Sequence, residues 1–235
     1  MADVLEVRGL YTSYGRVPML RGVDLVIPKG QVCCVLGANG SGKTTLVKAI
    51  LNMVKADRGS MFLEGENIDS WPTHKRVEQG VTLSAAAVGT FRKMTVDANL
   101  RMGAYHINNR KLLSQRLAEI YKLFPVLRER LNQKAGTLSG GERTMLAIAR
   151  AVVNHPKLLI LDEPSLGLAP IMVETVFAII RFLCAGQMSI LLVEQNAAKA
   201  LSMASTGYVL QKGAIVFAGS VDALAASEHV RNPVI

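Results

Sequence analysis

GANGSGKTT at residues 37–45 decides the fold that this sequence predicts. It fits the pattern G-x-x-x-x-G-K-[ST] and lies between Gln31–Leu36, an apolar run typical of a buried strand, and a helix expected over Lys43–Val54. Glycines let a backbone approach an anion and adopt turns that a Cβ would forbid. The N–H groups of such a loop converge on a phosphate, so the stretch predicts a phosphate-binding loop. Lys43 would reach the β- and γ-phosphates of a nucleotide, and the Thr44 hydroxyl would ligate Mg²⁺.

A second predicted strand ends in two acidic residues. Leu158–Leu161 is apolar throughout and is followed by Asp162 and Glu163. A carboxylate at the carboxyl end of a parallel strand faces the crevice in which ligands bind. Asp162 would then hold Mg²⁺, directly or through water, and Glu163 would orient or deprotonate an attacking water. The alternative is a strand that ends in a solvated acidic turn, which the loop at 37–45 makes less favourable.

A third motif opens a helix expected over Glu142–Val153. Its residues are Leu138, Ser139, Gly140, Gly141 and Glu142. Ser139 with Glu142 three residues later is the pattern of a capping box. Two interpretations remain open at this point: a helix cap alone, or a second anion site made of a hydroxyl, two glycines and a helix N-terminus.

The remaining pattern alternates strands with helices, which predicts an α/β fold with a mostly parallel sheet. Val96 to about Arg130 differs, because apolar residues recur there at three- and four-residue steps, and it predicts a helical insertion. The other expected strands are Val4–Val7, Asp24–Ile27, Ser60–Leu63, Val81–Leu83 and Ser189–Val193; the other helices are Ile171–Cys184 and Ala197–Met203; Tyr208–Leu210 and Ala214–Phe217 form an expected hairpin.

The composition favours a globular chain. Its 235 residues correspond to one large or two small domains, and 50% hydrophobic against 19% charged residues excludes intrinsic disorder. The best candidate for a membrane span, Met172–Val193, is interrupted by Glu174 and Arg181. We expect no signal peptide, because Asp3, Glu6 and Arg8 interrupt the N-terminus.

The net charge of +9 fits anionic partners or a solvated basic surface. The basic residues are dispersed and form no five-residue run, which weakens the case for nucleic-acid binding. The cysteines are interpreted as small core residues and the histidines as surface or loop residues. They are Cys33, Cys34, Cys184, His74, His106, His155 and His229. The side chains of Cys33 and Cys34 are expected on opposite faces of a strand.

Together the three motifs and their spacing resemble the nucleotide-binding subunits of ABC transporters. The wording of Gly37–Gly40, Glu163–Pro170 and Val193–Asn196 is similar to that of the branched-chain amino acid importer ATPases, and within these to the smaller of the two paired subunits. The resemblance implies a P-loop NTPase core with a mostly parallel sheet, a small antiparallel β region and a helical insertion subdomain. It also implies one domain over 1–235, with the ATP-binding core at 1–87 and 136–235 and the helical subdomain at about 88–135.

The resemblance also implies the roles of particular residues. Tyr14, rather than Tyr11, matches the aromatic residue that stacks on adenine, and Ser165–Pro170 matches the loop that crosses the dimer interface. The implied ATP-binding residues are Tyr14, Gly37, Asn39, Gly40, Ser41, Gly42, Lys43, Thr44 and Thr45; Thr44 and Asp162 are the metal ligands; Glu163 and Gln195 are catalytic; Leu138, Ser139, Gly140, Gly141 and Glu142 form the signature that closes over the partner's ATP.

One position departs from the family pattern. Alignment through Gly80 and Phe91–Val96 places Ala86 where the family has Gln, or Glu in this subgroup. Alanine can neither ligate Mg²⁺ nor hold the attacking water, so we expect intact binding of Mg-ATP and slow hydrolysis. Gln195 stands where most members have His, and it can still donate a hydrogen bond.

The resemblance implies an ATPase that powers uptake of a small solute, with branched-chain or other hydrophobic amino acids expected. Its cofactors would be ATP and Mg²⁺. Its partners would be a second ATPase subunit in a homo- or heterodimer, membrane permease subunits and, indirectly, a solute-binding protein, at the cytoplasmic face of the inner membrane. The alternatives are a non-transport ATPase acting on nucleic acid or the ribosome, and a regulatory subunit with weakened hydrolysis.

Overall fold

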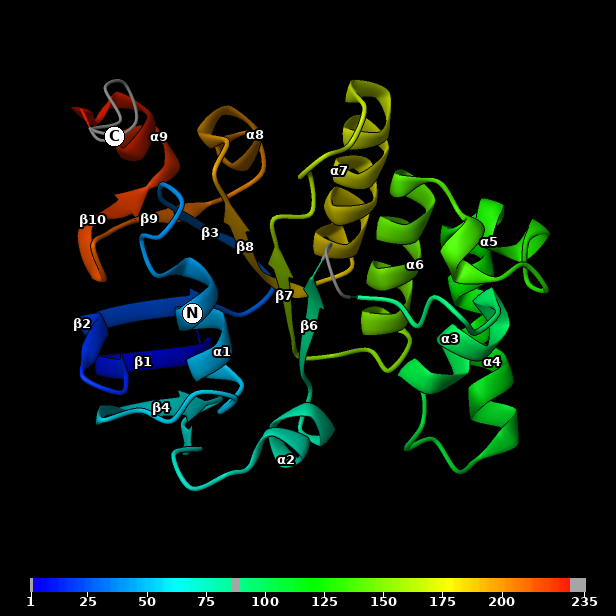
Figure 1. Cartoon of the computed structure of the whole chain (residues 1–235), viewed down its shortest axis with the longest axis horizontal. Helices are drawn as coiled ribbons and strands as arrows, with labels where there is room; N and C mark the ends of the chain where they lie inside the picture. The colour runs from blue at the N-terminus through cyan, green and yellow to red at the C-terminus, as the bar shows by residue number, and fades with distance from the viewer. Residues whose placement is uncertain (1, 86–88, 229–235) are drawn as a thin grey trace.

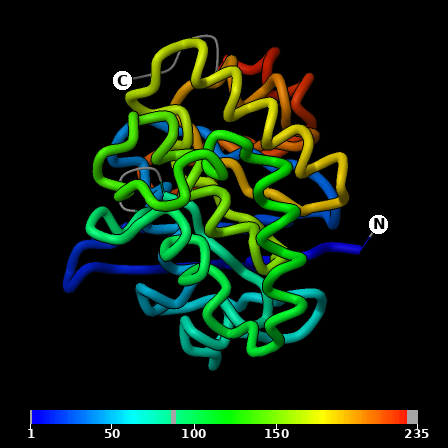
Figure 2. Tube along the Cα trace, turned by 90° about the vertical axis from the view of Figure 1, so that its right-hand side faces the viewer, coloured from blue at the N-terminus to red at the C-terminus, as the bar shows by residue number. Residues whose placement is uncertain are grey.

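The computed structural model describes residues 2–85 and 89–228, and it contains two sheets (Figure 1). The smaller sheet is antiparallel, with the strand order β2-β1-β4-β5. Its strands are β1 (Asp3–Tyr14), β2 (Val17–Pro28), β4 (Arg58–Leu63) and β5 (Glu66–Asn67). Figure 2 shows the long β1–β2 hairpin extending to one side of the molecule.

The larger sheet has the strand order β10-β9-β3-β8-β7-β6, and all neighbours are parallel except β9 and β10. Its strands are β3 (Val32–Leu36), β6 (Val81–Ala85), β7 (Leu158–Asp162), β8 (Ser189–Glu194), β9 (Thr206–Gln211) and β10 (Ala214–Ser220). The three apolar runs predicted as buried strands form its centre, which confirms the mostly parallel α/β fold.

Side chains alternate between the two faces of the central strands and feed two hydrophobic cores. Cys33 packs with α1 (Lys43–Ile50) and the small sheet, whereas Cys34 packs on the other side with α6 (Gly140–Val152) and α7 (Pro170–Ala185). The predicted opposite placement of the two cysteines is therefore confirmed, and burial raises the pKa of each thiol to about 12. The third cysteine, Cys184, lies only partly buried beside the core.

Shorter helices complete the fold at its edges. They are α2 (Thr73–Glu78), α8 (Ala197–Leu201) and α9 (Val221–Ala226). The sequence predicted α8 but neither α2 nor α9. In the part of the chain that the structure describes, no helix is both long and apolar enough to cross a membrane.

The predicted helical insertion consists of three helices. They are α3 (Val96–Gly103), α4 (Arg110–Leu123) and α5 (Pro125–Glu129), followed by the short 3₁₀ helix η1 (Ala135–Thr137). The side chains of Thr95 and Asn109 cap α3 and α4, and the break between these helices divides the single segment that the periodicity indicated. Leu117 and Ile120 turn the apolar stripe of α4 toward the core, as predicted.

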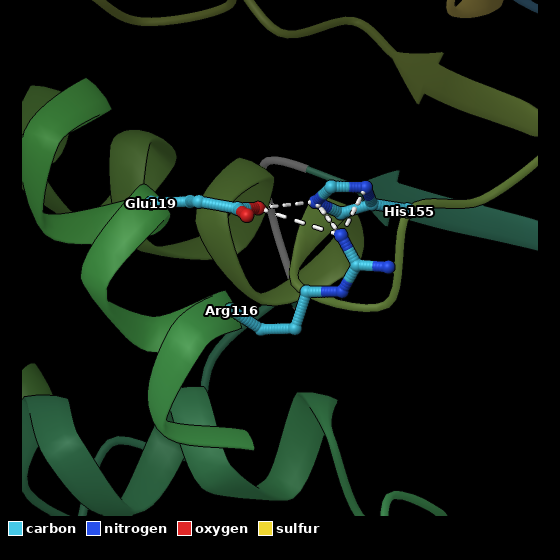
Figure 3. A network of polar contacts seen from close by, with 3 residues as sticks. All are labelled: Arg116, Glu119 and His155. Atoms are coloured by element: carbon cyan, nitrogen blue, oxygen red, sulfur yellow. Dashed lines mark hydrogen bonds and ion pairs between the residues drawn. The ribbon is translucent and has the colours of Figure 1, made fainter. Parts of the chain in front are cut away.

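A polar contact joins α4 to the loop between α6 and β7 (Figure 3). The Nε2 atom of His155 lies 2.7 Å from a carboxylate oxygen of Glu119, and the Arg116 guanidinium lies against both ring nitrogens. His155 is exposed, as is His74, whereas His106 is half-buried. His229 lies outside the described residues. Because the contact is exposed, it positions the helical insertion at a gain of about 0–1 kcal/mol.

The first helix ends at Ile50, four residues earlier than the sequence predicted. The fully buried Arg76 of α2 explains this end, because its guanidinium donates to the carbonyl oxygens of Ala49 and Ile50 at 3.2 and 2.7 Å. It also donates to Trp71 and Ile68. Burial lowers the pKa of Arg76 to about 10, so the guanidinium stays charged at neutral pH. Its positive charge therefore interacts favourably with the negative C-terminal end of the α1 dipole.

Replacing Arg76 with Met should lower the free energy of unfolding by roughly 3 kcal/mol or more. The substitution leaves several buried carbonyl groups without a donor, and each such group costs about 1–3 kcal/mol. Denaturant unfolding of Arg76→Met measures the loss. The control is Arg8→Met, which removes an exposed partner of Glu6 and should cost about 1 kcal/mol or less. Equal losses in the two variants would contradict this role for Arg76.

Candidate nucleotide-binding site

The loop at residues 37–45 follows β3 directly and leads into α1. Gly40 and Gly42 have φ angles of 78° and 112°, which lie in the region that residues with a Cβ rarely adopt. A Cβ on Gly37 would collide with the carbonyl oxygen of Leu210. The hydroxyl oxygen of Ser41 is buried and is one of the described polar atoms without a hydrogen-bond partner. The loop thus needs its glycines and contains a buried polar atom free to bind.

Lys43 lies at the centre of this loop and is only 5% exposed. Its ammonium group donates to the carbonyl oxygens of Gly37 and Ala38 at 2.9 and 3.1 Å. The same Nζ atom lies 3.4 Å from Oε1 of Glu163. A buried cation held by three oxygens at the mouth of the loop can neutralise the charge of a phosphate bound there.

Thr44 and Asp162 come together from α1 and β7. The Thr44 hydroxyl lies 3.4 Å from Oδ2 of Asp162, while Oδ1 of Asp162 is buried with no hydrogen-bond partner among the described residues. Burial, and next the charge of Glu163, raise the pKa of the Asp162 carboxyl, against the opposing effects of Thr44 and Lys43. An unpaired carboxylate oxygen beside a hydroxyl is a fitting pair of ligands for Mg²⁺.

Glu163 has a left-handed backbone, with φ of 50°. Its N–H donates to the carbonyl oxygen of Val193 on β8 at 2.9 Å, which ties the turn after β7 to the neighbouring strand. Residues in such conformations persist only where their surroundings hold them, and they cluster at functional sites. Gln195 follows β8 and is exposed, so the carboxyl ends of β3, β7 and β8 gather most of the predicted site residues.

The signature segment lies elsewhere, at the N-terminus of α6. The predicted capping box is present: the Ser139 N–H donates to Glu142 at 2.8 Å, and the Glu142 N–H donates to the Ser139 hydroxyl at 3.3 Å. Glu142 also pairs with Arg130 at 2.9 Å. Leu138 is buried, and a Cβ on Gly141 would collide with Met172. The helix cap is thus confirmed, and the structure does not bring this segment to the loop at 37–45.

The two tyrosines considered for adenine stacking lie on β1. Tyr14 is 45% exposed and Tyr11 is 43% exposed, so neither is a core residue. Tyr14 ends the strand next to the turn of the β1–β2 hairpin, where its ring is available for stacking. Ala86, the departure from the family pattern, lies outside the described residues.

The sequence did not reveal that the β9–β10 turn supports the loop. Gly213 donates its N–H to the Ser41 carbonyl oxygen at 2.9 Å and accepts from Arg21 at 2.7 Å. Its φ of 82° requires glycine, and a Cβ there would collide with the carbonyl oxygen of Met19. The sequence identified Lys212-Gly213 only as a hairpin turn, because nothing local links it to a loop about 170 residues away.

A glycine-rich loop after the central parallel strand β3, together with the carboxylates at the end of β7, defines a P-loop nucleotide-binding protein. The family described as "ABC transporter" matches residues 20–166. The chain belongs to this family and is an ATP-binding, ATP-hydrolysing transport ATPase. The resemblance to the ATP-binding proteins of branched-chain amino acid transport is also confirmed by the relatives that follow.

Two curated relatives carry branched-chain amino acid names. The high-affinity branched-chain amino acid transport ATP-binding protein BraG of Pseudomonas aeruginosa is 40% identical over 94% of each chain. The probable branched-chain amino acid transport ATP-binding protein LivF of Archaeoglobus fulgidus is 37% identical over 96% of this chain and 95% of its own. The lipopolysaccharide export ATP-binding protein LptB of Acidithiobacillus ferridurans is 30% identical over 98% and 96%.

Solved structures have the same fold. A nucleotide-free ATP-binding cassette from an ABC transporter matches with a TM-score of 0.89 and 25% identity over 99% of each chain. The ADP conformation of another ABC transporter cassette matches with a TM-score of 0.85 and 26% identity over 99% of this chain and 96% of that one. These likenesses confirm the P-loop NTPase core with an antiparallel β region and a helical insertion.

Gly213→Ala should weaken binding of ATP by roughly tenfold, about 1.4 kcal/mol. The added Cβ displaces the turn whose N–H holds the Ser41 carbonyl, so the loop loses an anchor. Calorimetric titration with ATP measures the change. The control is Gly65→Ala, another turn glycine with positive φ (85°) and open space around its Cβ position. Equal affinities in the two variants would show that the turn does not support the loop.

Proposed function

We propose that this chain is the ATP-binding subunit of an importer for branched-chain or other hydrophobic amino acids. The observation that carries this proposal is the 40% identity to BraG over 94% of both chains, compared with 30% identity to LptB. Since LptB is named for lipopolysaccharide export, the direction of transport is the point on which an experiment must decide.

The geometry of the loop at 37–45 and of the carboxyl end of β7 supports the roles proposed for most of the site residues. Lys43 binds the β- and γ-phosphates, and the N–H groups of the loop at 37–45 surround them. Thr44 and Asp162 hold Mg²⁺, which would neutralise charge on the phosphates. Glu163, whose carboxylate lies next to Lys43, accepts the proton of the attacking water. Gln195 donates a hydrogen bond to the γ-phosphate.

Two of these residues, Lys43 and Glu163, interact with one another. The ammonium of Lys43 lies 3.4 Å from the carboxylate of Glu163, so both are held by a charge of opposite sign. When a phosphate binds Lys43, the Glu163 carboxylate would give up this contact and be free to meet the attacking water. Binding of the nucleotide would therefore prepare the group that activates water.

The complete site is proposed to need a second subunit. ABC ATPase subunits of transporters work as dimers with membrane permease components. The signature segment, with Ser139, Gly140 and Gly141, would close over the ATP that the other subunit holds. Tyr14 would stack on the adenine of the ATP that is bound by its own subunit. In the loop Ser165–Pro170, the 62% exposed Leu166 would be covered in the dimer.

The helical insertion is proposed to contact the permease at the cytoplasmic face of the membrane. Three large apolar side chains on or beside its helices are exposed: Met102 (43%), Tyr105 (56%) and Leu112 (39%). Exposed apolar side chains of this size are candidates for burial in a protein–protein contact. The expected core at 1–87 and 136–235 and subdomain at about 88–135 match this division of tasks.

Transport by the assembled complex tests the function. The complex is purified from membranes through a tag on this chain and placed in vesicles with Mg-ATP on the side of the ATPase. We expect uptake of labelled leucine, isoleucine or valine in the presence of the solute-binding protein. In Glu163→Gln, ATP binding should persist while hydrolysis falls by roughly 10²- to 10³-fold and uptake stops. Movement of lipopolysaccharide instead of amino acids would overturn the proposal.

Ala86→Gln should raise ATP hydrolysis by the assembled complex severalfold without changing ATP affinity. Glutamine restores a polar group that can hold water and Mg²⁺ where alanine offers none. The neighbouring substitution Ala85→Gln is the control, because it places the same side chain one position earlier, at the end of β6. No gain in rate for Ala86→Gln would contradict the expectation of weakened hydrolysis.

A further inference from the structure

Glu194 is a buried carboxylate to which neither the sequence nor the proposed mechanism gives a role. It ends β8 and is only 2% exposed. Glutamate is rarely buried to this extent unless it has a partner. Its Oε1 atom accepts a hydrogen bond from the N–H of Ser165 at 3.2 Å, and Ser165 is itself buried.

The environment of Glu194 places a cost on its charge. Burial raises the pKa of its carboxyl, while hydrogen bonds from Ser165 and Gln195 and the charge of Lys199 act in the opposite direction. An apolar residue would fill this position without that cost. The acidic side chain of Glu194 therefore points to a contact that an apolar side chain cannot make.

Glu194 lies where three functional segments meet. In the sheet it stands opposite Leu36, the last residue of β3 before the phosphate loop. It precedes Gln195, and its partner Ser165 begins the loop proposed to cross the dimer interface. Ser165 in turn lies two residues after Glu163, the proposed base.

The hydrogen bonds of Glu163 and Ser165 explain why this contact matters. Glu163 has a left-handed backbone, and its N–H is held by the Val193 carbonyl at 2.9 Å. Two residues further along the turn, the N–H of Ser165 donates a hydrogen bond to the Glu194 side chain. Two successive residues of β8 thus anchor the turn on either side of Pro164. Without the second anchor, the chain after Glu163 could leave the conformation that directs its carboxylate toward Lys43.

We propose that Glu194 is a positioning residue for ATP hydrolysis, whose buried carboxylate holds Ser165 and so fixes Glu163 and the start of the dimer-crossing loop relative to Gln195. The proposal rests on the role proposed for Glu163. Glu194 does not touch the nucleotide in this arrangement and acts through the backbone that it holds. Its loss should therefore lower the rate of hydrolysis more than the affinity for ATP.

The test uses the assembled, membrane-extracted complex with three variants of position 194. Glu194→Met keeps the volume and removes the acceptor, and Glu194→Ala is a second variant without an acceptor in case the first does not fold. Both should lower kcat for ATP by about tenfold and leave KM within about twofold. Glu194→Gln keeps an oxygen that can accept from Ser165, and it should retain at least half of the wild-type kcat.

A matched control lies at the other end of the same strand. The buried hydroxyl of Ser189 accepts a hydrogen bond from the Gly30 N–H at 2.9 Å, so Ser189→Ala also removes a side-chain acceptor of a loop N–H. This variant should lower the melting temperature but keep kcat. A kcat for Glu194→Met and Glu194→Ala equal to that of Ser189→Ala, or a Glu194→Gln as slow as Glu194→Met, would overturn the proposal.

Glu163→Gln, measured in parallel, separates this proposal from the function on which it rests. If Glu163→Gln abolishes hydrolysis and Glu194→Met does not slow it, only the role of Glu194 fails. If Glu163→Gln hydrolyses ATP at the wild-type rate, the proposed base is wrong and the positioning role fails with it. A slow Glu194→Met, an active Glu194→Gln and an inactive Glu163→Gln together support both.

Discussion

The loop between β3 and α1 must bring several backbone N–H groups to one point, and only residues without a Cβ can follow that path at Gly40 and Gly42. Within the loop, the ammonium group of Lys43 donates to the carbonyl oxygens of Gly37 and Ala38. From outside, the loop is held by the Gly213 N–H, and the carbonyl oxygen of Leu210 leaves no room for a Cβ at Gly37. The sheet order, with β9 beside β3, is what places this support. The position of the phosphate loop is therefore a property of the whole sheet.

The same edge of the sheet gathers charges that the fold alone does not need. Burial raises the pKa of Asp162 and Glu194, and the backbone of Glu163 is in a disfavoured region. Each feature costs folding stability. Lys43 offsets part of this cost by lying close to Glu163. The site is thus suited to a ligand that brings negative charge, and stability is given up where the chemistry is proposed to occur.

The sequence predicted the centre of the fold well because β3, β7 and β8 are buried on both faces and appear as short, uninterrupted apolar runs. It predicted only a third of β1, because register shifts break the alternation from Val7 onward. The end of α1 was missed because Arg76 comes from another helix. The support by Gly213 and the anchor at Glu194 were missed for the same reason: both join residues that are far apart in the chain. Local patterns carry motifs and buried strands, whereas the contacts that hold a motif in place depend on the tertiary fold.

The contacts within this chain explain one of the two glycines of the signature segment but not the other. Gly141 is required by packing, since a Cβ there would collide with Met172 of α7. Gly140 has no such reason among the described residues, because its Cβ would meet only Leu168 at an ordinary 3.7 Å and its φ is not positive. Glycine in a helix costs up to about 1 kcal/mol relative to alanine. The role proposed for this segment would account for that cost, because ATP held by a second subunit would approach Gly140 closely at the N-terminus of α6.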